Sequence, residues 1–374
     1  MPRVIGIDPG TVSIDLCGLD DGGVFLDRSL ATAQALAHPS TLVDLIDTEH
    51  RAAKLDLVAG PSGYGLPLIL GRDLADIDIR LACLTAKGDD SGGIGGLATL
   101  MRELGRSAAP LVFTPGVIHL PSVPAHRKVN RVDMGTADKV CAVALAIHEQ
   151  AERRGAGIHD VSFILLELGG AFTATIAVDR GSIVDGLGGS SGPVGMRAAG
   201  ALDGEVAFLA GSVPKRMLFG GGAMTIAGLS DRDADVLAVP RVDRTNAPTA
   251  SQDRLAWDAY IESAVKSVAA LAVSVPDARE VILSGRMARV ASVQDELAGR
   301  LRGVMANASV HVLTGFATVA KQAAQGAALL ADGLAGGRGA RLVEAMGIRS
   351  SSGTALDHLY VISQATARAR IGIT

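Results

Sequence analysis

The sequence predicts an α/β protein made of two related halves, and three observations support this fold class. Val4–Asp27 reads as apolar strands on either side of an acidic turn, and a similar pattern returns at Ile164. Short apolar runs such as Leu55–Ala59 and Val281–Leu283 are interleaved with longer segments of helical periodicity, as in α/β folds. At 374 residues the chain is also long for one domain, so two are expected.

The first turn, Asp8-Pro9-Gly10-Thr11, carries residue types that suit a metal-bound phosphate chain. Asp8 can reach a hydrated divalent ion, and Gly10 lets the backbone approach a phosphate closely. Thr11 and Ser13 add N–H and O–H donors. An ordinary hairpin with a polar turn is the alternative interpretation, because so short a motif is weakly specific by itself.

The pattern of this hairpin occurs twice in the sequence. Displacing the sequence by 159 positions places Ile5–Gly10 over Ile164–Gly169, and Asp20–Gly22 over Asp179–Gly181. Strand, acid-x-Gly, strand and D-x-G turn therefore recur in register, as a single duplication. Two halves that each contribute an acid and a glycine-rich turn suggest a cleft in which one nucleotide is held from both sides.

Periodicity and turn residues predict the remaining elements. The expected helices are Ser40–Arg51, Ile94–Leu104, Thr136–Gln150, Leu255–Val273, Val290–Leu301 and Ala317–Leu330. Further strands are expected at Leu111–Phe113, Val117–Leu120, Val161–Leu166 and Val310–Leu313. Lys87–Gly96 is expected to be a solvated connection, with a lid as the alternative.

Composition narrows the classes of partner. The net charge is −4 and aromatic residues make up 3% of the chain, which argues against nucleic acid and anionic membranes. No apolar run of membrane-spanning length and no signal-peptide pattern occurs, so no membrane partner is expected. Cys17, Cys83 and Cys141 are scattered and lack a C-x-x-C spacing. They are expected to be buried, reduced thiols in a cytoplasmic protein.

Two segments of the first half are candidates for an acceptor site. Gly60–Gly65 follows an apolar strand, where ligands gather in α/β sheets, and Ser62 and Tyr64 can line a pocket there. A Gly/Pro turn chosen for its backbone shape explains this loop equally well. The second segment is a dense polar group ahead of the helix at 136. It favours a substrate site over a solvated helix start, and comprises His126, Arg127, Lys128, Asn130, Arg131, Asp133, Asp138 and Lys139.

In the second half, Gly169 and Gly170 follow Glu167 as Gly10 follows Asp8, so this turn is a second candidate for phosphate binding. Further on, the buried strand Val281–Leu283 ends in Ser284-Gly285-Arg286. Gly285 allows a base or ribose to lie against the backbone, so this turn can frame a purine. A plain strand-to-helix turn is the alternative for this segment.

Together these residues resemble the superfamily that joins acetate and sugar kinases, heat-shock ATPases and actin (ASKHA). Asp8-x-Gly10-Thr11, Glu167-Leu168-Gly169-Gly170 and Val281–Gly285 look like its two phosphate motifs and its adenosine motif. The alanine-rich helices at 136–147 and 317–330 are similar to its two connecting helices. The resemblance covers roughly residues 3 to 333 in order.

Within that superfamily the chain most resembles a poorly characterised family described as predicted butyrate kinases. Asn130–Lys139 and the Gly60–Pro67 loop carry that resemblance, and Ala201–Glu205 looks like a motif of butyrate and acetate kinases. Two positions depart from the usual pattern. Glu167 stands where many members have Asp, and Gly285-Arg286 stands where a pair of glycines is usual.

The resemblance implies two RNase H-like domains with mixed sheets flanked by helices, and ATP and Mg²⁺ in the cleft between them. The expected domains are residues 1–153 and 154–335, followed by an extension at 336–374. As catalytic residues, Asp8 would hold the metal through water, and Glu167 would complete the metal shell or orient the acceptor. The implied nucleotide-binding residues are Gly10, Thr11, Ser13, Gly169, Gly170, Ala171, Gly285 and Arg286. The expected partner is a small-molecule acceptor, and a homodimer is possible.

Three functions compete at this stage. A kinase for a small carboxylate needs no general base, but an arginine such as Arg127 or Arg131 should hold the acceptor. A kinase for a hydroxyl acceptor would use Asp138 as the base, and Gly135–Lys139 is similar to a stretch of type III pantothenate kinases. An ATP-driven switch or scaffold of the actin type is the third. Ser62, Tyr64, Asn130 and Asp133 are the expected acceptor contacts in either kinase.

Overall fold

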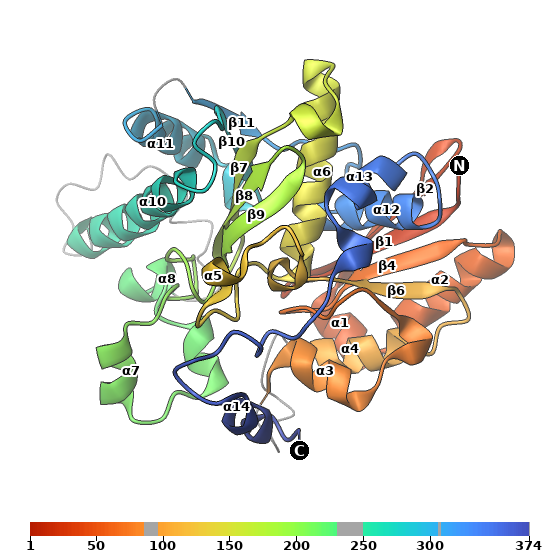
Figure 1. Cartoon of the computed structure of the whole chain (residues 1–374), viewed down its shortest axis with the longest axis horizontal. Coiled ribbons are helices and arrows are strands. Elements are labelled where there is room, and N and C mark those ends of the chain that lie inside the picture. The colour runs from red at the N-terminus through yellow and green to blue at the C-terminus, as the bar shows by residue number, and fades with distance from the viewer. Residues whose placement is uncertain (86–95, 230–249, 306–307, 374) are drawn as a thin grey trace. The chain divides into compact units, whose positions relative to one another are not determined.

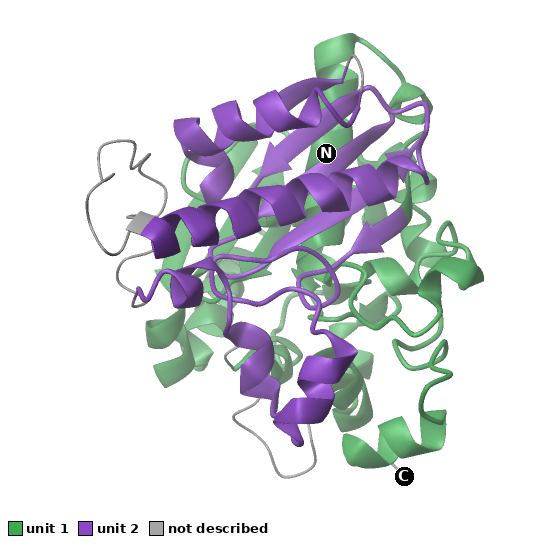
Figure 2. Ribbon diagram, turned by 90° about the vertical axis from the view of Figure 1, so that its left-hand side faces the viewer, with its two compact units in different colours: residues 1–161, 180–184, 314–374 green, residues 162–179, 185–313 purple. Residues whose placement is uncertain are grey.

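The computed structural model describes residues 1–85, 96–229, 250–305 and 308–373 (Figure 1). Most of the connection predicted at 87–96 lies outside the described residues. The chain divides into two compact units, shown in Figure 2. Unit 1 contains residues 1–161, 180–184 and 314–374, and unit 2 contains residues 162–179 and 185–313. The two domains and the extension expected from the sequence, and the cleft between the domains, stay predictions.

Unit 1 contains a mixed sheet in the order β3-β2-β1-β4-β6-β5. β1 pairs antiparallel with β2 and parallel with β4, so the first hairpin is joined to a parallel core. The strands are β1 (Val4–Pro9), β2 (Ser13–Asp20), β3 (Gly23–Ala31), β4 (Leu57–Pro61), β5 (Ile69–Leu70) and β6 (Leu111–Thr114).

Unit 2 contains a second mixed sheet, in the order β11-β10-β7-β8-β9. Its strands are β7 (Phe163–Leu168), β8 (Thr173–Asp179), β9 (Ser182–Leu187), β10 (Glu280–Ser284) and β11 (Ser309–Val312). Read from β9, this order repeats β3-β2-β1-β4-β6, with the same antiparallel hairpin and the same parallel neighbour. Even the register repeats, because Asp8 faces Asp15 and Glu167 faces Ala174, each 159 positions further on. The α/β class and the two-sheet arrangement predicted from the sequence are confirmed.

Helices flank both sheets. Those with residues in unit 1 are α1 (Thr32–Ala37), α2 (Ser40–Ala52), α3 (Asp76–Cys83), α4 (Leu97–Leu104), α5 (Ala125–Lys128), α6 (Ala137–Arg154), α12 (Gln322–Leu334), α13 (Ala340–Ala345) and α14 (Gln364–Arg370). Those of unit 2 are α7 (Gly204–Ala210), α8 (Ala223–Ile226), α10 (Ala250–Ala272) and α11 (Ala291–Leu301). Among the described residues no helix is long and apolar enough to cross a membrane.

Two local predictions were wrong. Val117–Leu120 is not a strand, because Val117–His119 forms a 3₁₀ turn between Pro115-Gly116 and Pro121. The helix expected from Ala317 begins only at Gln322. The backbone N–H groups of residues 318–320 bond the carboxylate of Asp27, and those of residues 316 and 317 bond the side chain of Gln325 within α12. Apolar residues made both segments look regular, but hydrogen bonds outside those of a regular strand or helix decide their backbone.

The two faces of β1 pack against different helices. Ile5 and Ile7 point into a buried core with Leu42 and Ile46 of α2 and with residues of α3 and α4. Because side chains alternate along a strand, Gly6 and Asp8 point to the opposite face. There α12 lies across the sheet and contacts β1, β2 and β4 (Figure 1). The first strand therefore has an apolar face and a face that ends in a carboxylate.

The packing of α12 depends on two glycines. A Cβ on Gly6 would lie 2.1 Å from the backbone nitrogen of Ala328, and a Cβ on Gly326 would lie 1.7 Å from the carbonyl oxygen of Cys141 in α6. Neither position has room for a side chain. The absence of side chains at these positions lets α12 contact the backbones of both β1 and α6. The alanine-rich sequences of α6 and α12 predicted close packing, but not these glycine contacts.

We therefore expect Gly326→Ala to destabilise the protein. The added methyl group must push α12 away from α6, and overpacking of this kind typically costs about 1–3 kcal/mol. Gly299→Ala is the matched control, because its Cβ would meet none of the described atoms within 4 Å in the exposed part of α11. It should stabilise by roughly 0.5–1 kcal/mol through helix propensity. Urea unfolding of both variants measures the difference, and equal stabilities would contradict the close packing.

Candidate functional site

Two buried carboxylates face each other at the end of the first hairpin. Asp8 in β1 lies opposite Asp15 in β2, and the two side chains are 6% and 1% exposed. Gly10 closes the turn, where its N–H donates to the carbonyl of Ser13. The hydroxyl of Thr32 donates to the carbonyl of Gly10 at 2.7 Å. The turn is thus held by its own backbone and concentrates negative charge at its base.

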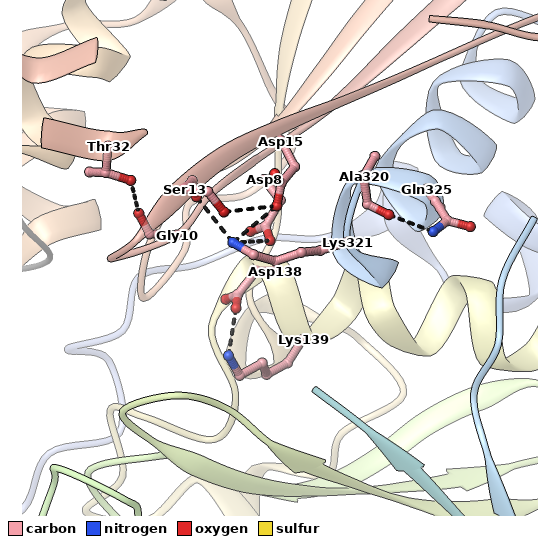
Figure 3. A network of polar contacts seen from close by, with 10 residues as sticks. All are labelled: Asp8, Gly10, Ser13, Asp15, Thr32, Asp138, Lys139, Ala320, Lys321 and Gln325. Atoms are coloured by element: carbon pink, nitrogen blue, oxygen red, sulfur yellow. Dashed lines mark hydrogen bonds and ion pairs between the residues drawn. The ribbon is translucent and has the colours of Figure 1, made fainter. Parts of the chain in front are cut away.

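The ammonium of Lys321 enters this turn from the start of α12 (Figure 3). Its Nζ lies 3.0 Å from Oδ2 of Asp15, 3.1 Å from the carbonyl oxygen of Ser13 and 4.0 Å from Oδ2 of Asp8. A Cβ on Gly10 would lie only 2.6 Å from the same nitrogen. Glycine at position 10 therefore makes room for the lysine, a role that the sequence did not suggest.

Three side chains hold the segment that leads to Lys321. Asp27 of β3 accepts hydrogen bonds from the backbone N–H groups of residues 318, 319 and 320, at 2.6–3.0 Å. Glu149 of α6 accepts from the N–H groups of residues 314 and 315. Gln325 accepts from residues 316 and 317 and donates to the carbonyl of Ala320 at 2.7 Å. Because these bonds fix the backbone, the lysine is delivered to the turn by a rigid segment.

Burial raises the pKa of the Asp8 carboxyl to about 7. The charge of Lys321 opposes this effect, that of Asp138 adds to it, Lys139 opposes it, and Asp15 adds to it. Removal from water therefore outweighs the nearest ammonium. An additional positive charge near this buried carboxyl would stabilise its ionised form.

A second ion pair starts α6. Asp138 bonds Nζ of Lys139 at 2.5 Å and accepts a hydrogen bond from the hydroxyl of Thr136. Burial acts to raise the pKa of Asp138, but the charge and hydrogen bond of Lys139, together with Thr136, outweigh it and lower the pKa below its usual value. Asp138 is therefore an ionised, weakly basic carboxylate at neutral pH. Arg131 precedes this helix and is half-buried.

The second acidic turn belongs to unit 2. Gly169 donates its N–H to the carbonyl of Phe172, and a Cβ there would lie 2.8 Å from that oxygen. Gly170 faces open space, since a Cβ there would meet none of the described atoms within 4 Å. Gly285 has φ +88° and approaches the carbonyl of Leu168, so it joins the adenosine-like turn to this one. The position of these residues relative to Asp8 stays a prediction.

The outer residues of the second turn have distinct environments. The carbonyl of Ala171 accepts the N–H groups of residues 197 and 198, so this residue fixes the following loop. Arg286 is exposed at the start of a 3₁₀ turn.

In the first turn, Thr11 is exposed at the tip, and Ser13 Oγ donates to Asp15 at 3.3 Å. Nucleotide contacts at Ala171, Arg286, Thr11 and Ser13 stay predictions.

The expected acceptor contacts mostly have structural partners. Ser62 is fully buried and donates to the carbonyl of Thr114 while accepting the N–H of Leu66. Asn130 has φ +54°, and its amide oxygen accepts the N–H groups of residues 360 and 361. Asp133 accepts from Gly135 within its own turn, and Tyr64 is 7% exposed. These residues shape and close loops, and their contact with an acceptor stays a prediction.

The carboxylate oxygens at the first turn suit Mg²⁺, which prefers hard oxygen ligands. The described residues contain no group of three or more His, Cys, Asp or Glu side chains that could hold a metal ion by themselves. In kinases, however, Mg²⁺ is usually held by one or two carboxylates together with substrate phosphates. Asp8 therefore fits an ion that is shared with bound phosphates.

Sequence reasoning missed two members of this cluster, Asp15 and Lys321. Asp15 interrupts an apolar strand, Ile14-Asp15-Leu16, and a charged residue inside a buried strand was the available signal. Lys321 carried no comparable signal, because it lies 308 positions from its partner Ser13. Only the packing of α12 on β1 brings it to the turn.

Comparisons with known proteins cover most of the chain. The model of a family described as "Protein of unknown function (DUF1464)" matches residues 6–361. No curated protein matches in sequence. Among solved structures, the chain is similar to a propionate kinase from Francisella tularensis, with 14% identity, TM-score 0.63, and 87% of this chain and 99% of that chain covered.

Two further solved structures resemble the chain at a similar level. Acetate kinase from Porphyromonas gingivalis has 12% identity and TM-score 0.59, with 87% of this chain and 98% of that chain covered. A Listeria monocytogenes protein, provisionally assigned as an N-acetylmannosamine kinase, has 11% identity and TM-score 0.51, with 87% and 97% covered. At these identities the likeness shows the fold alone. That fold, called the kinase fold below, is the one that the chain shares with these solved structures, and it agrees with the fold predicted from the sequence motifs.

The raised pKa of Asp8 predicts how stability depends on pH. Between its unfolded value of 3.8 and its folded value of about 7, the folded protein binds more protons at Asp8 than the unfolded chain does, so stability falls as pH rises. Asp8→Asn removes this titration. Relative to the parent, the variant should gain in Tm between pH 5 and pH 8, measured without ligands. Asp73→Asn on the surface is the control, and a Tm difference for Asp8→Asn that is constant with pH would contradict the assignment.

Proposed function

The chain belongs to this family of unknown function, and we propose that it is an ATP-dependent phosphotransferase acting on a small carboxylate. The observation that carries the proposal is the cluster of Asp8, Asp15 and Lys321 at the first glycine turn of a kinase fold. This cluster combines oxygen ligands for a metal ion with an ammonium at a turn of the phosphate-binding type. The acceptor class is the finer part of the proposal.

The nucleotide is proposed to contact both acidic turns. At the first, the exposed N–H and hydroxyl of Thr11 at the tip are open to a phosphate. At the second, Gly170 leaves open space beside the backbone. Gly285, whose positive φ brings the backbone close to that turn, is proposed to contact the nucleoside. The similarity of the two hairpins supports a shared ligand type.

Phosphoryl transfer requires positioning and charge neutralisation more than covalent chemistry. When bound, Mg²⁺ would neutralise charge on the phosphates next to Asp8. The backbone N–H groups of the turns orient the phosphates. The buried base of the first hairpin excludes water. Gly170 keeps the approach to the second turn free of side chains among the described residues.

The carboxylate acceptor is favoured by the state of Asp138. A hydroxyl acceptor benefits from a general base whose pKa lies near the working pH. The pKa of Asp138 is instead lowered, and Lys139 occupies one of its oxygens at 2.5 Å. An ionised carboxylate acceptor is already a nucleophile and needs an arginine to hold it, for which Arg131 is the proposed residue. A hydroxyl acceptor, with Asp8 as the base, is the second candidate because the pKa of Asp8 is about 7.

Acyl-phosphate trapping tests the acceptor class. The purified protein is incubated with ATP, Mg²⁺, hydroxylamine and each of a panel of short carboxylic acids. The proposal expects hydroxamate from at least one acid, at a rate above that of Asp8→Asn. ADP release that depends on a sugar or another alcohol, without hydroxamate, would support the hydroxyl candidate. ADP release that no acceptor changes would indicate an ATP-driven switch.

Gly170→Val should weaken nucleotide binding without unfolding the protein. The open space around this glycine accepts a side chain, but the branched group would stand where a phosphate approaches the backbone. Gly169→Val is a poorer test, since its side chain would strain the turn at Phe172. Calorimetry should show at least a tenfold loss of ATP affinity. Gly220→Val, also in open space with φ −123°, is the control and should bind as the parent does.

A pair of variants separates a carboxylate acceptor from a hydroxyl acceptor that uses Asp138 as its base. For a carboxylate, Arg131→Lys should be severe because an ammonium does not reproduce the bidentate guanidinium fork, and Asp138→Asn should be mild. For a hydroxyl that uses Asp138 as its base, the order should reverse, with about 10²–10⁴-fold of rate lost in Asp138→Asn. Steady-state kinetics with the acceptor found by trapping gives the order. Circular dichroism verifies that both variants are folded.

A further inference from the structure

We propose that the ammonium of Lys321 binds the terminal phosphates of the nucleotide. This inference rests on the proposed function and adds a residue that neither the sequence motifs nor the family description assigns. Lys321 stands at the start of α12, and its side chain is 40% exposed, whereas the carboxylates beside it are almost fully buried. The lysine therefore forms the solvent-facing side of the cluster, where an incoming anion meets it first.

The hydrogen bonds of the ammonium leave a donor for a ligand. An ammonium carries three N–H groups. In the described part of the chain, Nζ contacts Asp15 at 3.0 Å and the carbonyl of Ser13 at 3.1 Å, and Asp8 lies beyond hydrogen-bond distance at 4.0 Å. Two donors are used and the third is available to an anion. The same nitrogen fills the space over Gly10, so a phosphate bound by the turn would lie next to it.

The charge balance explains why a lysine is needed here. Asp8 and Asp15 face each other across the hairpin, and a phosphate chain would bring further negative charge to them. Lys321 offsets the charge of Asp15 directly and lowers the pKa of Asp8, although burial outweighs it. Without the ammonium, an anion would be repelled by the carboxylates that are proposed to share its metal ion. The lysine therefore lets one small site hold both acids and phosphates.

The segment before Lys321 is built to keep it in place. Asp27 receives three backbone N–H groups and the hydroxyl of Thr318. Burial acts to raise the pKa of Asp27, but these hydrogen bonds outweigh it and lower the pKa, so this carboxylate stays ionised and keeps its bonds. A preorganised ammonium gives up less side-chain entropy when it binds a phosphate. Asp27 is thus a positioning residue for Lys321.

The test compares nucleotides that differ in phosphate number. Calorimetry gives the Kd of ATP, ADP and AMP for the parent, Lys321→Met and Lys321→Arg, each with and without Mg²⁺. A charged hydrogen bond to the terminal phosphates predicts at least a tenfold loss of ATP affinity in Lys321→Met. AMP affinity should be unchanged, and Lys321→Arg should recover much of the loss. Lys266→Met is the control, an exposed lysine of α10 paired with Glu262.

The outcomes separate this inference from the proposed function. Equal losses for ATP and AMP, or no loss for either, in a parent that binds ATP would overturn the role of Lys321 alone. A parent that binds no nucleotide would overturn both. If Lys321→Met does not fold, amine labelling of the parent followed by mass spectrometry replaces it. ATP, but not AMP, should protect Lys321 from acetylation, and equal labelling in both would contradict the inference.

Discussion

Much of unit 1 depends on the close contact of α12 with the backbones of β1 and α6. Gly6 and Gly326 have no side chains at the two points of contact, and neither has room for one. Along β1, the step from Gly6 to Asp8 covers about 7 Å on one face of the strand. Along α12, about five residues separate Lys321 from the helix segment opposite Gly6, a rise of about 7.5 Å. The two spacings match, so the contact that packs the helix also delivers the lysine to the acid.

The duplication is close in backbone and unequal in chemistry. Both hairpins repeat in register, yet the position that holds Asp15 in the first holds Ala174 in the second. The first turn therefore has two acids and a lysine, whereas the second has one acid and open glycines.

Local patterns in the sequence were sufficient for the hairpins, the repeat and the kinase fold. Acid-x-Gly turns between apolar strands are short-range signals, and the order of the strands follows from the duplication. The start of α12 was not predictable, because the backbone N–H groups before it donate hydrogen bonds to Asp27 and Gln325 and so stay out of the helix. Lys321 was missed for the same reason, since its role depends on a contact across 308 positions. For Asn130 the sequence showed only polar neighbours. Its amide oxygen accepts the N–H groups of residues 360 and 361, a contact across 230 positions that no local pattern indicates.

The central claim is that the first acidic turn and Lys321 receive the phosphates of ATP. A crystal structure of the protein with Mg²⁺ and a non-hydrolysable ATP analogue tests it most directly. The account predicts a terminal phosphate oxygen within hydrogen-bond distance of Nζ of Lys321, with other phosphate oxygens on the backbone N–H groups next to Gly10. A nucleotide whose phosphates lie away from this turn would contradict it.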